Sequence, residues 1–428
     1  MNKLTIGLIG YGVVGQGVAK ILKNKRAEFK RQYGCDFNLK TVVDRSIHKK
    51  STAGLHLRRS KKPEDVLKDP DIDVVIELIG GKQPAKQIVE TALKNGKDVI
   101  TANKDLIANY GLELFKLANQ QGRHLYYESA VGAGIPIIKT ISEGVAGNGF
   151  SGVYGIINGT CNFILDEMTS KHCSFEAALK DAQQLGYAES DPTLDVNGMD
   201  STHKIAILTF LAFGKMLKVK DIYTEGITNI SHVDITYAEK MGLCIKLLGI
   251  AKKENNEVEV RVHPTLISKQ HPLAAVHSIL NAVYLKADKL GNMMLSGEGA
   301  GQMAAASGVI SDLVNCANAP NERINANNPQ EEPGLKLRKI DNIECKFYIR
   351  IEAVDKPGVL ARITGILGRA GIGINSVQQN PHEKEAHVPV ILLTDYSTEK
   401  KLRRALNQIE KLKTVKRKPV AIRMEKLW

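Results

Sequence analysis

The first third of the chain alternates short apolar runs with amphipathic or polar helical stretches. An apolar run from Leu4 to Ile9 leads into a glycine-rich turn, and a helical stretch with Val18 and Leu22 on one face follows. A polar helical extension is expected over residues 23–37. Later apolar runs cover residues 39–44, 73–81, 97–104 and 124–134. Strands that alternate with helices predict an α/β fold built on a parallel, doubly wound sheet.

The pattern changes after Ile135 to a mixture of helices and longer strand-like runs. Helical periodicity covers residues 175–185 and 200–213, whereas strand-like alternation covers residues 257–267 and 282–301. This mixed α+β region extends to about Asn315 and is typical of a second domain appended to an α/β domain.

The last part of the chain follows a segment rich in Asn, Pro and acidic residues, 315–334, which indicates a linker. Beyond it the pattern predicts strand, helix, strand, strand, helix and strand over residues 345–354, 355–371, 372–378, 387–394, 399–412 and 415–424. This order is that of a ferredoxin-like sandwich.

Composition excludes several classes of protein. No window approaches about 18 consecutive apolar residues, so no membrane span is expected. The first residues enter a strand directly and lack the pattern of a signal peptide. Six cysteines lie far apart without a CxxC pair, which favours reduced thiols and a cytoplasmic location over disulfides or a zinc site.

Basic residues gather at both ends of the chain, whose formal net charge is +13. Residues 1–60 hold thirteen Lys and Arg against three acids, and residues 398–428 hold eleven against three. Such clusters attract anionic partners. However, the chain has no helix-turn-helix, zinc knuckle or basic-aromatic stacking motif, and only 5% of its residues are aromatic. We therefore expect no nucleic-acid partner.

A glycine-rich turn, Gly10-x-Gly12-x-x-Gly15, stands between the first predicted strand and the first predicted helix. That context makes it a dinucleotide-binding motif. Gly10 permits the tight turn, Gly12 lets the backbone approach a pyrophosphate, and Gly15 lets helix and strand pack closely. The helix N-terminus supplies N–H groups for the phosphates.

The ends of later strands add candidate cofactor contacts. Asp44 ends the second strand, where an acid normally accepts hydrogen bonds from ribose hydroxyls, and Arg45 beside it can hold a ribose 2′-phosphate. The pair permits both NAD and NADP, and the basic balance of this domain favours NADP. Gly80 and Lys104 also fall at strand ends, and Lys104 is a candidate functional cation.

The stretch Gly186–Ile207 concentrates acidic residues in front of one lysine. Lys204 follows four carboxylates: Glu189, Asp191, Asp195 and Asp200. The first half of the stretch is expected to be a loop and the second half a helix. Asp200 and Lys204 then lie one helical turn apart on the same face.

Several blocks of the chain resemble homoserine dehydrogenases. The run from Ala182 to Lys204 closely resembles the signature of that family, with all of its charged positions present. Other blocks resemble the family in the same order: GLIGYGVVG, TANK, ESAVGAGIPII, GIINGTCNFIL and GEGAGQMAAASGVISDL. The resemblance covers residues 3 to about 315, with a mild departure at Asn158, where family members can carry Ser.

The resemblance implies a reversible, NAD(P)H-dependent reduction of L-aspartate 4-semialdehyde to L-homoserine in threonine, methionine and isoleucine biosynthesis. Hydride transfer to an aldehyde leaves a developing alkoxide that needs a cation or a proton donor. Lys204 and Lys104 are the candidates, and Asp200 would hold the Lys204 ammonium in place. The ammonium group of the substrate calls for a carboxylate such as Glu189 or Asp195.

The resemblance also implies contacts residue by residue. Cofactor contacts are expected from Gly12, Val13, Val14, Arg45, Lys104 and Gly301. Substrate contacts are expected from Gly159, Thr160, Tyr187, Glu189, Asp195 and Asp200, with proton transfer by Lys204. A sodium ion is implied on the main-chain carbonyls of Glu128, Val131, Ala133 and Ile135.

The segments DKPGVLARI and GIGINSV resemble an ACT domain, a small amino-acid-sensing module. L-Threonine is the effector that this resemblance implies, with inhibition as its effect. The effector residues are expected in the loop that opens the first helix and on the strand opposite: Asp355, Gly358, Val359 and Asn375. ACT sheets commonly pair edge to edge, so we expect a homodimer or a homotetramer.

Together these observations predict an NAD(P)-binding Rossmann domain over residues 1–134 and a catalytic and dimerisation domain over 135–315. The last helix of the second domain, about 301–315, is expected to return to the nucleotide domain. A linker over 316–344 and an ACT domain over 345–428 follow. Truncation near Pro333 is expected to leave an active enzyme that has lost inhibition.

Other functions fit the sequence less well. A dehydrogenase for a 2-hydroxy acid would need a His paired with an acid, and an Arg for the substrate carboxylate. No such set lies near the predicted cofactor strands. A non-enzymatic sensor that grips nucleic acid lacks the recognition motifs noted above.

Overall fold

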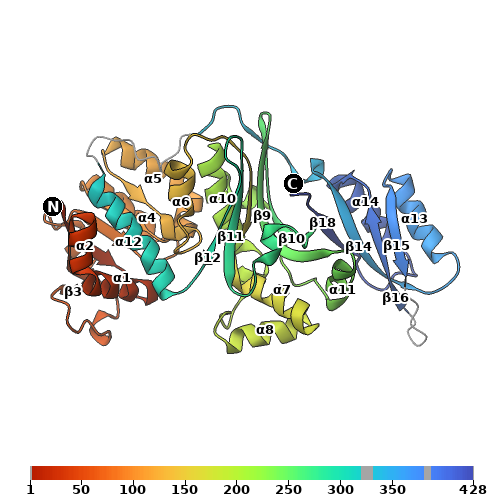
Figure 1. Ribbon diagram of the computed structural model, residues 1–428, viewed down its shortest axis with the longest axis horizontal. Helices are drawn as coiled ribbons and strands as arrows, with labels where there is room; N and C mark the ends of the chain where they lie inside the picture. Colours follow the sequence, from red (N-terminus) through yellow and green to blue (C-terminus); the bar gives the residue numbers. More distant parts are fainter. Residues whose placement is uncertain (1, 320–330, 380–386, 428) are drawn as a thin grey trace. The chain divides into compact units, whose positions relative to one another are not determined.

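The structure is a computed structural model that describes residues 2–319, 331–379 and 387–427 (Figure 1). The chain divides into two compact units, and each combines segments that are distant in the sequence. The first unit comprises Met1–Gly159, Asp200–Ile222 and Ile279–Gly334. The second unit comprises Thr160–Met199, Tyr223–Ser278 and Leu335–Trp428.

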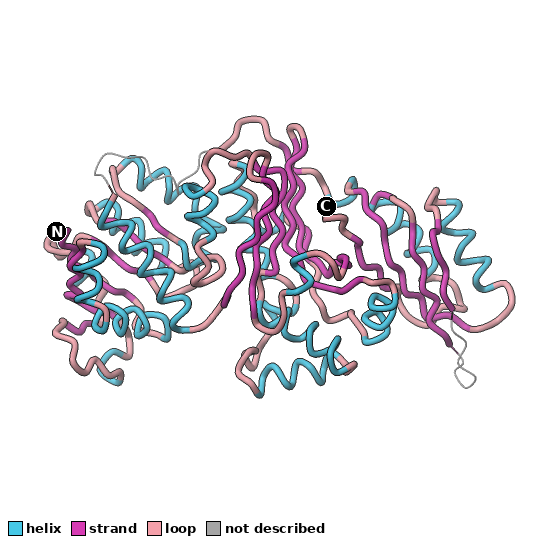
Figure 2. The backbone as a smooth tube through the Cα atoms, viewed as in Figure 1, coloured by secondary structure: helices cyan, strands magenta, loops and turns pink. Residues whose placement is uncertain are grey.

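The first unit contains the predicted parallel sheet, with strand order β3-β2-β1-β4-β5-β6, as in a doubly wound fold. The strands are β1 (Asn2–Ile9), β2 (Cys35–Val43), β3 (Arg58–Ser60), β4 (Val74–Glu77), β5 (Asp98–Thr101) and β6 (Leu125–Tyr126). Helices alternate with them (Figure 2): α1 (Val13–Asn24), α2 (Arg26–Tyr33), α3 (Glu64–Leu67), α4 (Ala85–Lys94) and α5 (Lys104–Gln120).

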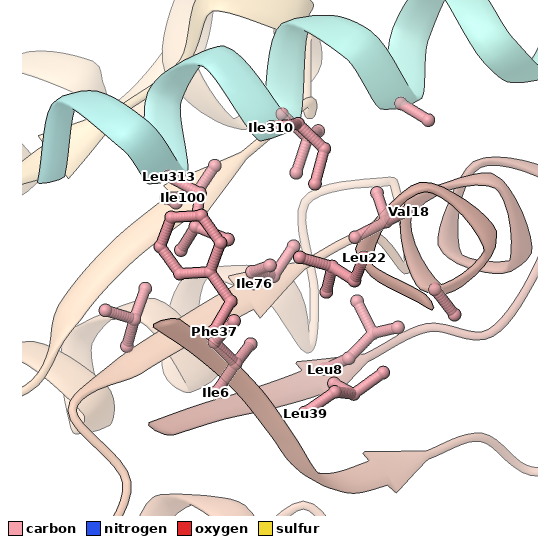
Figure 3. Packing of buried hydrophobic residues seen from close by; sticks show 14 of the residues in the cluster. Ile6, Leu8, Val18, Leu22, Phe37, Leu39, Ile76, Ile100, Ile310 and Leu313 are labelled. Atoms are coloured by element: carbon pink, nitrogen blue, oxygen red, sulfur yellow. The ribbon is translucent and has the colours of Figure 1, made fainter. Parts of the chain in front are cut away.

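A helix from far along the chain completes the core of this sheet. Figure 3 shows α12 (Gln302–Asn318) lying over the sheet, with Ile310 and Leu313 directed toward Ile76 and Ile100 of the strands. At about 25 cal/mol per Å² of buried apolar surface, such contacts attach the helix firmly to the sheet. The end of the region predicted as a second domain thus belongs to the nucleotide-binding core.

The rest of the first unit carries an antiparallel set of strands and two further helices. β11 (Leu280–Ala287) pairs with both β7 (Phe150–Ile156) and β12 (Gly291–Glu298). The helices are α6 (Ile137–Lys139) and α10 (Met199–Phe213).

The second unit begins with helices and a long hairpin. The helices are α7 (Gly159–Lys171, from its second residue), α8 (Phe175–Gln184), α9 (Thr193–Val196) and α11 (His232–Lys240). β9 (Leu243–Glu254) and β10 (Glu257–Ser268) form an antiparallel pair, and the short strand β8 (Tyr223–Thr224) runs parallel to β10. Among the helices that the structure describes in either unit, none is long and apolar enough to cross a membrane.

The C-terminal part of the second unit has the predicted ferredoxin-like order. Its sheet runs β18-β14-β16-β15, and two helices cover it. The elements are β14 (Glu344–Val354), α13 (Val359–Arg369), β15 (Ile374–Gln379), β16 (His387–Thr394), α14 (Glu399–Ile409) and β18 (Val420–Met424), with the short strands β13 (Lys336–Leu337) and β17 (Ser397–Thr398). β18 also pairs in parallel with β10, with Thr265 opposite Arg423.

Three local predictions were wrong. Residues 35–37 were expected to be helical, but Gly34 ends α2 with a φ of +66°, and Cys35 and Phe37 then point into the core as part of β2. The strand expected over 124–134 covers only β6, because a 3-10 helix follows at Glu128. Lys104 begins helix α5 and does not end a strand.

Candidate active site

Two lysines and one aspartate meet in the first unit. Asp200 Oδ1 lies 3.0 Å from Lys104 Nζ, and Asp200 Oδ2 lies 2.8 Å from Lys204 Nζ. The side-chain amide of Asn158 donates to Asp200 Oδ2 at 2.9 Å, and Lys204 Nζ also donates to the carbonyl of Ile157 at 2.7 Å. The carboxylate therefore bridges the two cations that the sequence suggested.

The charges of this cluster balance the effect of burial. Burial alone would raise the pKa of Asp200, but the ammonium groups of Lys204 and Lys104 outweigh it and hold that pKa below its ordinary range. The side chain of Lys104 is 42% exposed, and that of Lys204 is 11% exposed. An ammonium has three N–H donors, and the described contacts of Lys204 use two, so one donor can meet a developing alkoxide.

Helix starts place the three side chains. The Asn197 side chain accepts from the N–H of Met199 at 3.0 Å where α10 begins, and Asp200 and Lys204 then lie one turn apart. In the same way, Asn103 caps α5 by accepting from Leu106 N, which makes Lys104 the first helical residue. A cation at a helix N-terminus opposes the helix dipole. The contact with Asp200, rather than helix stability, accounts for a lysine there.

The remaining predicted substrate residues, apart from Gly159, lie in the second unit. Thr160 Oγ1 donates to the carbonyl of Tyr187 at 2.7 Å, so these two predicted positions are brought together. Glu189 is exposed and Asp195 is partly buried in α9. The carboxylates of Glu189 and Asp195 remain predicted ligands for an ammonium group.

The glycine-rich turn has the geometry expected for a dinucleotide. Gly10 has a φ of +105°, and a side chain at Gly15 would come within 2.2 Å of the Gly10 carbonyl oxygen. Nothing lies within 4 Å of the place that a side chain at Gly12 would take, so a phosphate can approach the backbone there. Val13 and Val14 open α1, and the Gln302 side chain donates to the carbonyl of Val13 at 2.9 Å, which brings the turn next to Gly301.

Asp44 is occupied by contacts within the protein. Its carboxylate accepts from Tyr11 N, Ser46 N, Ser46 Oγ and Lys50 Nζ, at 3.0, 2.8, 2.8 and 2.7 Å. Burial alone would raise the pKa of Asp44, but the Lys50 ammonium and these N–H and O–H donors lower it to about 2. Arg45 is exposed and forms no ion pair with the described residues. The choice between NAD and NADP stays a prediction.

A buried carboxylate that sequence reasoning missed shapes the turn at Gly80. Glu77, at the end of β4, accepts from Thr101 Oγ1 at 2.6 Å and from the N–H groups of Ile79 and Gly80 at 2.8 and 3.3 Å. Burial raises its pKa. The sequence offered one signal for Glu77, its position at the carboxyl end of a parallel strand. A single acid that ends an apolar run usually marks only the end of the strand, so it does not stand out as a buried carboxylate.

A second missed residue is Asn281 on β11. It is 1% exposed, and neither polar atom of its side chain has a hydrogen-bond partner among the described residues. A side chain at Gly299 would collide with it, and Gly159 lies close by. A single Asn within an apolar strand gives no signal in sequence, since its surroundings depend on tertiary contacts.

The predicted sodium loop lies in the first unit. The carbonyls of Glu128, Ala133 and Ile135 accept from Val131 N, Ser129 Oγ and Ile137 N at 3.3, 3.2 and 2.7 Å. Each carbonyl oxygen has a second lone pair, so each can accept from a further partner, and the sodium ion stays a prediction. In the described residues no cluster of His, Cys, Asp and Glu could hold a metal ion.

The predicted effector residues all belong to the C-terminal module of the second unit. Gly358 precedes α13 with a φ of +87°, and Val359 is the first helical residue. Asp355 Oδ1 accepts from the Gln379 side chain at 2.9 Å, and Asn375 is exposed on β15. Whether they bind an amino acid stays a prediction.

Comparison with known proteins agrees with this geometry. The chain matches the family described as "Homoserine dehydrogenase, NAD binding domain" over residues 10–128, "Homoserine dehydrogenase" over 136–314 and "ACT domain" over 347–411. A homoserine dehydrogenase from Neisseria gonorrhoeae is 39% identical, with 100% of both chains covered.

Solved structures agree as well. A homoserine dehydrogenase from Thiobacillus denitrificans is 40% identical with a TM-score of 0.92, covering 100% of this chain and 99% of that one. A hyperthermophilic archaeal homoserine dehydrogenase in complex with NADPH is 26% identical with a TM-score of 0.64. It covers 75% of this chain and 100% of its own.

The dinucleotide-binding sheet and the lysine–aspartate cluster define an NAD(P)-dependent oxidoreductase that acts on a CH–OH group. Within that class, the chain belongs to the homoserine dehydrogenase family and carries a C-terminal ACT domain.

Proposed function

We propose that this protein catalyses the reversible reduction of L-aspartate 4-semialdehyde to L-homoserine, a step of threonine, methionine and isoleucine biosynthesis. The observation that carries the proposal is the Asp200 carboxylate bridging the ammonium groups of Lys104 and Lys204. The nicotinamide supplies the hydride when bound. The cluster then has to stabilise and protonate the oxygen of the aldehyde.

Lys204 is the proton donor in this proposal. As the new C–H bond forms, a proton moves from Lys204 Nζ to the developing alkoxide, and in the reverse direction the neutral amine takes it back. Asp200 stays anionic and orients both lysines, while Lys104 adds a second positive charge for the oxygen.

Carboxylates recognise the other end of the substrate. Glu189 and Asp195 bind the ammonium group, and Gly159, Thr160 and Tyr187 shape the surroundings of the substrate. Two anions against one cation give a preference for an amino aldehyde over the same aldehyde without its amino group.

NADP is the preferred cofactor in our proposal. Asp44 is engaged by Lys50 and by backbone donors, which leaves little of its carboxylate for ribose hydroxyls. Arg45 beside it is exposed and can pair with a 2′-phosphate. The NADPH bound to the archaeal relative agrees with this choice.

Regulation and assembly complete the proposal. L-Threonine binds the ACT domain at Asp355, Gly358, Val359 and Asn375 and lowers activity, and the enzyme works as a homodimer or homotetramer in the cytoplasm. A sodium ion on the carbonyls of Glu128, Val131, Ala133 and Ile135 stiffens the loop that precedes α6.

The direct test is the oxidation of NADPH, followed by absorbance, with L-aspartate 4-semialdehyde and with succinate semialdehyde, which lacks the amino group. We expect fast oxidation with the first, formation of L-homoserine by mass spectrometry, and a rate lower by about 100-fold or more with the second. Equal rates with both aldehydes, or no oxidation with the amino aldehyde, would refute the assignment.

A further inference from the structure

A buried arginine joins the last strand of the ACT domain to the segment that follows α10. Arg423, on β18, is 4% exposed. Its guanidinium donates to Glu399 at 2.7 and 3.0 Å, to Glu225 at 2.8 Å and to the hydroxyl of Tyr223 at 2.8 Å. It also lies over the ring of Tyr223, 4.7 Å from the centroid. Glu399 belongs to the ACT domain, whereas Tyr223 and Glu225 lie more than a hundred residues before the start of that domain.

The contacts around Tyr223 form one network. The hydroxyl of Tyr223 donates to Glu225 at 2.8 Å while it accepts from Arg423. Burial raises the pKa of Tyr223 to about 12, so this hydroxyl keeps its proton. A planar guanidinium with two carboxylates and a hydroxyl fixes orientation as well as distance.

The segment held by this network supports the loop of Asp195. Ile227 N donates to the carbonyl of Val196 at 2.9 Å. A side chain at Gly226 would come within 2.0 Å of the same carbonyl oxygen, so the two backbones touch. Val196 is the last residue of α9 and directly follows Asp195.

α9 is a single turn. Besides the contact with Gly226 and Ile227, the Cys161 thiol donates to the carbonyl of Asp195 at 3.2 Å, and the Asp191 carboxylate accepts from Thr193 N at 3.1 Å. A displacement of Glu225 would pass through Gly226 and Val196 to the neighbouring Asp195.

We propose that Glu225 and Arg423 are positioning residues for Asp195, so that the ACT domain sets the affinity for the ammonium group of the substrate. This inference rests on the proposed function, in which Asp195 binds that group. In this inference β18 of the ACT domain contributes to substrate binding through Arg423. Changes in the ACT domain should therefore alter KM rather than kcat.

The test is Glu225→Ala in the full chain, with Glu257→Ala as the matched control. Both changes remove a carboxylate 2.8 Å from an arginine, and both leave that arginine a second carboxylate: Glu399 for Arg423 and Glu254 for Arg338. Of these two glutamates, Glu225 is the one next to Gly226 and Ile227, which contact α9. KM for aspartate semialdehyde, kcat and the Kd of NADPH are measured for each variant.

We expect Glu225→Ala to raise KM by roughly 5- to 20-fold, with kcat and the Kd of NADPH within about twofold of the parent. Glu257→Ala should leave all three unchanged. An unchanged KM in Glu225→Ala, or an equal loss of kcat and cofactor affinity, would overturn the inference while parent activity leaves the proposed function intact. Failure of the parent to reduce the aldehyde would instead refute the proposed function.

Discussion

At the scale of single residues, Asp200 determines what the site can do. It is 7% exposed, and it stays ionised because two ammonium groups and an amide compensate for lost hydration. Without Asp200 the two ammonium groups would repel each other. One buried anion therefore converts two separate cations, from α5 and α10, into a single site for a developing alkoxide.

Arg45 carries the preference for NADP at the same scale. Arg45→Ala should weaken NADP binding by about 10- to 100-fold, since a charge-assisted contact with the 2′-phosphate contributes roughly 1.5–3 kcal/mol. NAD binding should change little. Calorimetric titration with each cofactor checks this. Arg31→Ala, which removes another exposed arginine of the first unit, is the control and should change neither affinity. Equal losses for NADP and NAD would show that Arg45 does not contact the phosphate.

At the scale of elements, the loop before α6 is held by a buried acid. Glu128 is 2% exposed and accepts from the N–H groups of Ile138 and Lys139 at 2.7 and 2.9 Å. Burial raises the pKa of Glu128 to about 7, although the two N–H donors lower it. Asp312 of α12 accepts from Glu128 N at 2.9 Å, and burial raises its pKa as well.

The raised pKa makes stability depend on pH. The folded state keeps a proton on Glu128 up to about pH 7, whereas the unfolded chain loses it near the ordinary value, so stability falls as pH rises between the two. In Glu128→Gln this contribution is absent. The unfolding temperature of the variant minus that of the parent should therefore rise from about pH 5 to about pH 8.

Thermal unfolding followed by circular dichroism at fixed ionic strength checks this. The amide adds a constant loss because one of its ends cannot accept from an N–H, so the slope and not the offset is the readout. A difference that is flat or falls with pH would contradict a raised pKa for Glu128.

The order of elements was predictable because periodicity and turn residues are local signals. The parallel, doubly wound sheet and the βαββαβ module follow from them, and the placement of Asp200 and Lys204 on one helix face follows from helical spacing, whereas the strand order did not follow from local signals. The contact of Lys104 with Asp200 was not predictable, because the two are far apart in sequence and meet only through tertiary packing. The same holds for Asn281. The role of Asp44 was predicted from its position at the end of a strand. Its ion pair with Lys50 was not predictable, because Lys50 lies in a loop whose sequence has no periodicity.

At the scale of the whole molecule, the ACT domain shares its sheet with the hairpin of the same unit. β18 pairs with β10, and Arg261 of β10, which is fully buried, contacts Glu259 and lies 2.7 Å from Glu425. Truncation near Pro333 would remove Glu425 and β18 together. That an enzyme truncated near Pro333 stays active and loses inhibition remains a prediction, and the truncation would also leave β10 without β18 and Arg261 without Glu425.

Glu425→Ala in the full chain isolates this effect. It leaves a buried guanidinium with one carboxylate fewer, and the free energy of unfolding should fall by about 3–5 kcal/mol. Chemical denaturation measures the change, and Glu410→Ala, at an exposed position of the same domain, should have little effect. A loss below about 1 kcal/mol would mean that the contact with Arg261 is dispensable.

The central claim is that the Lys104–Asp200–Lys204 cluster protonates the reduced aldehyde. The most direct measurement is the turnover of Lys204→Ala with aspartate semialdehyde, together with its Kd for NADPH. Asp200 keeps Lys104 as a partner in this variant, so folding should be preserved. We predict a turnover lower by about 100-fold or more and a Kd within about twofold of the parent. Near-normal turnover in the folded variant would contradict the claim and move proton transfer to Lys104.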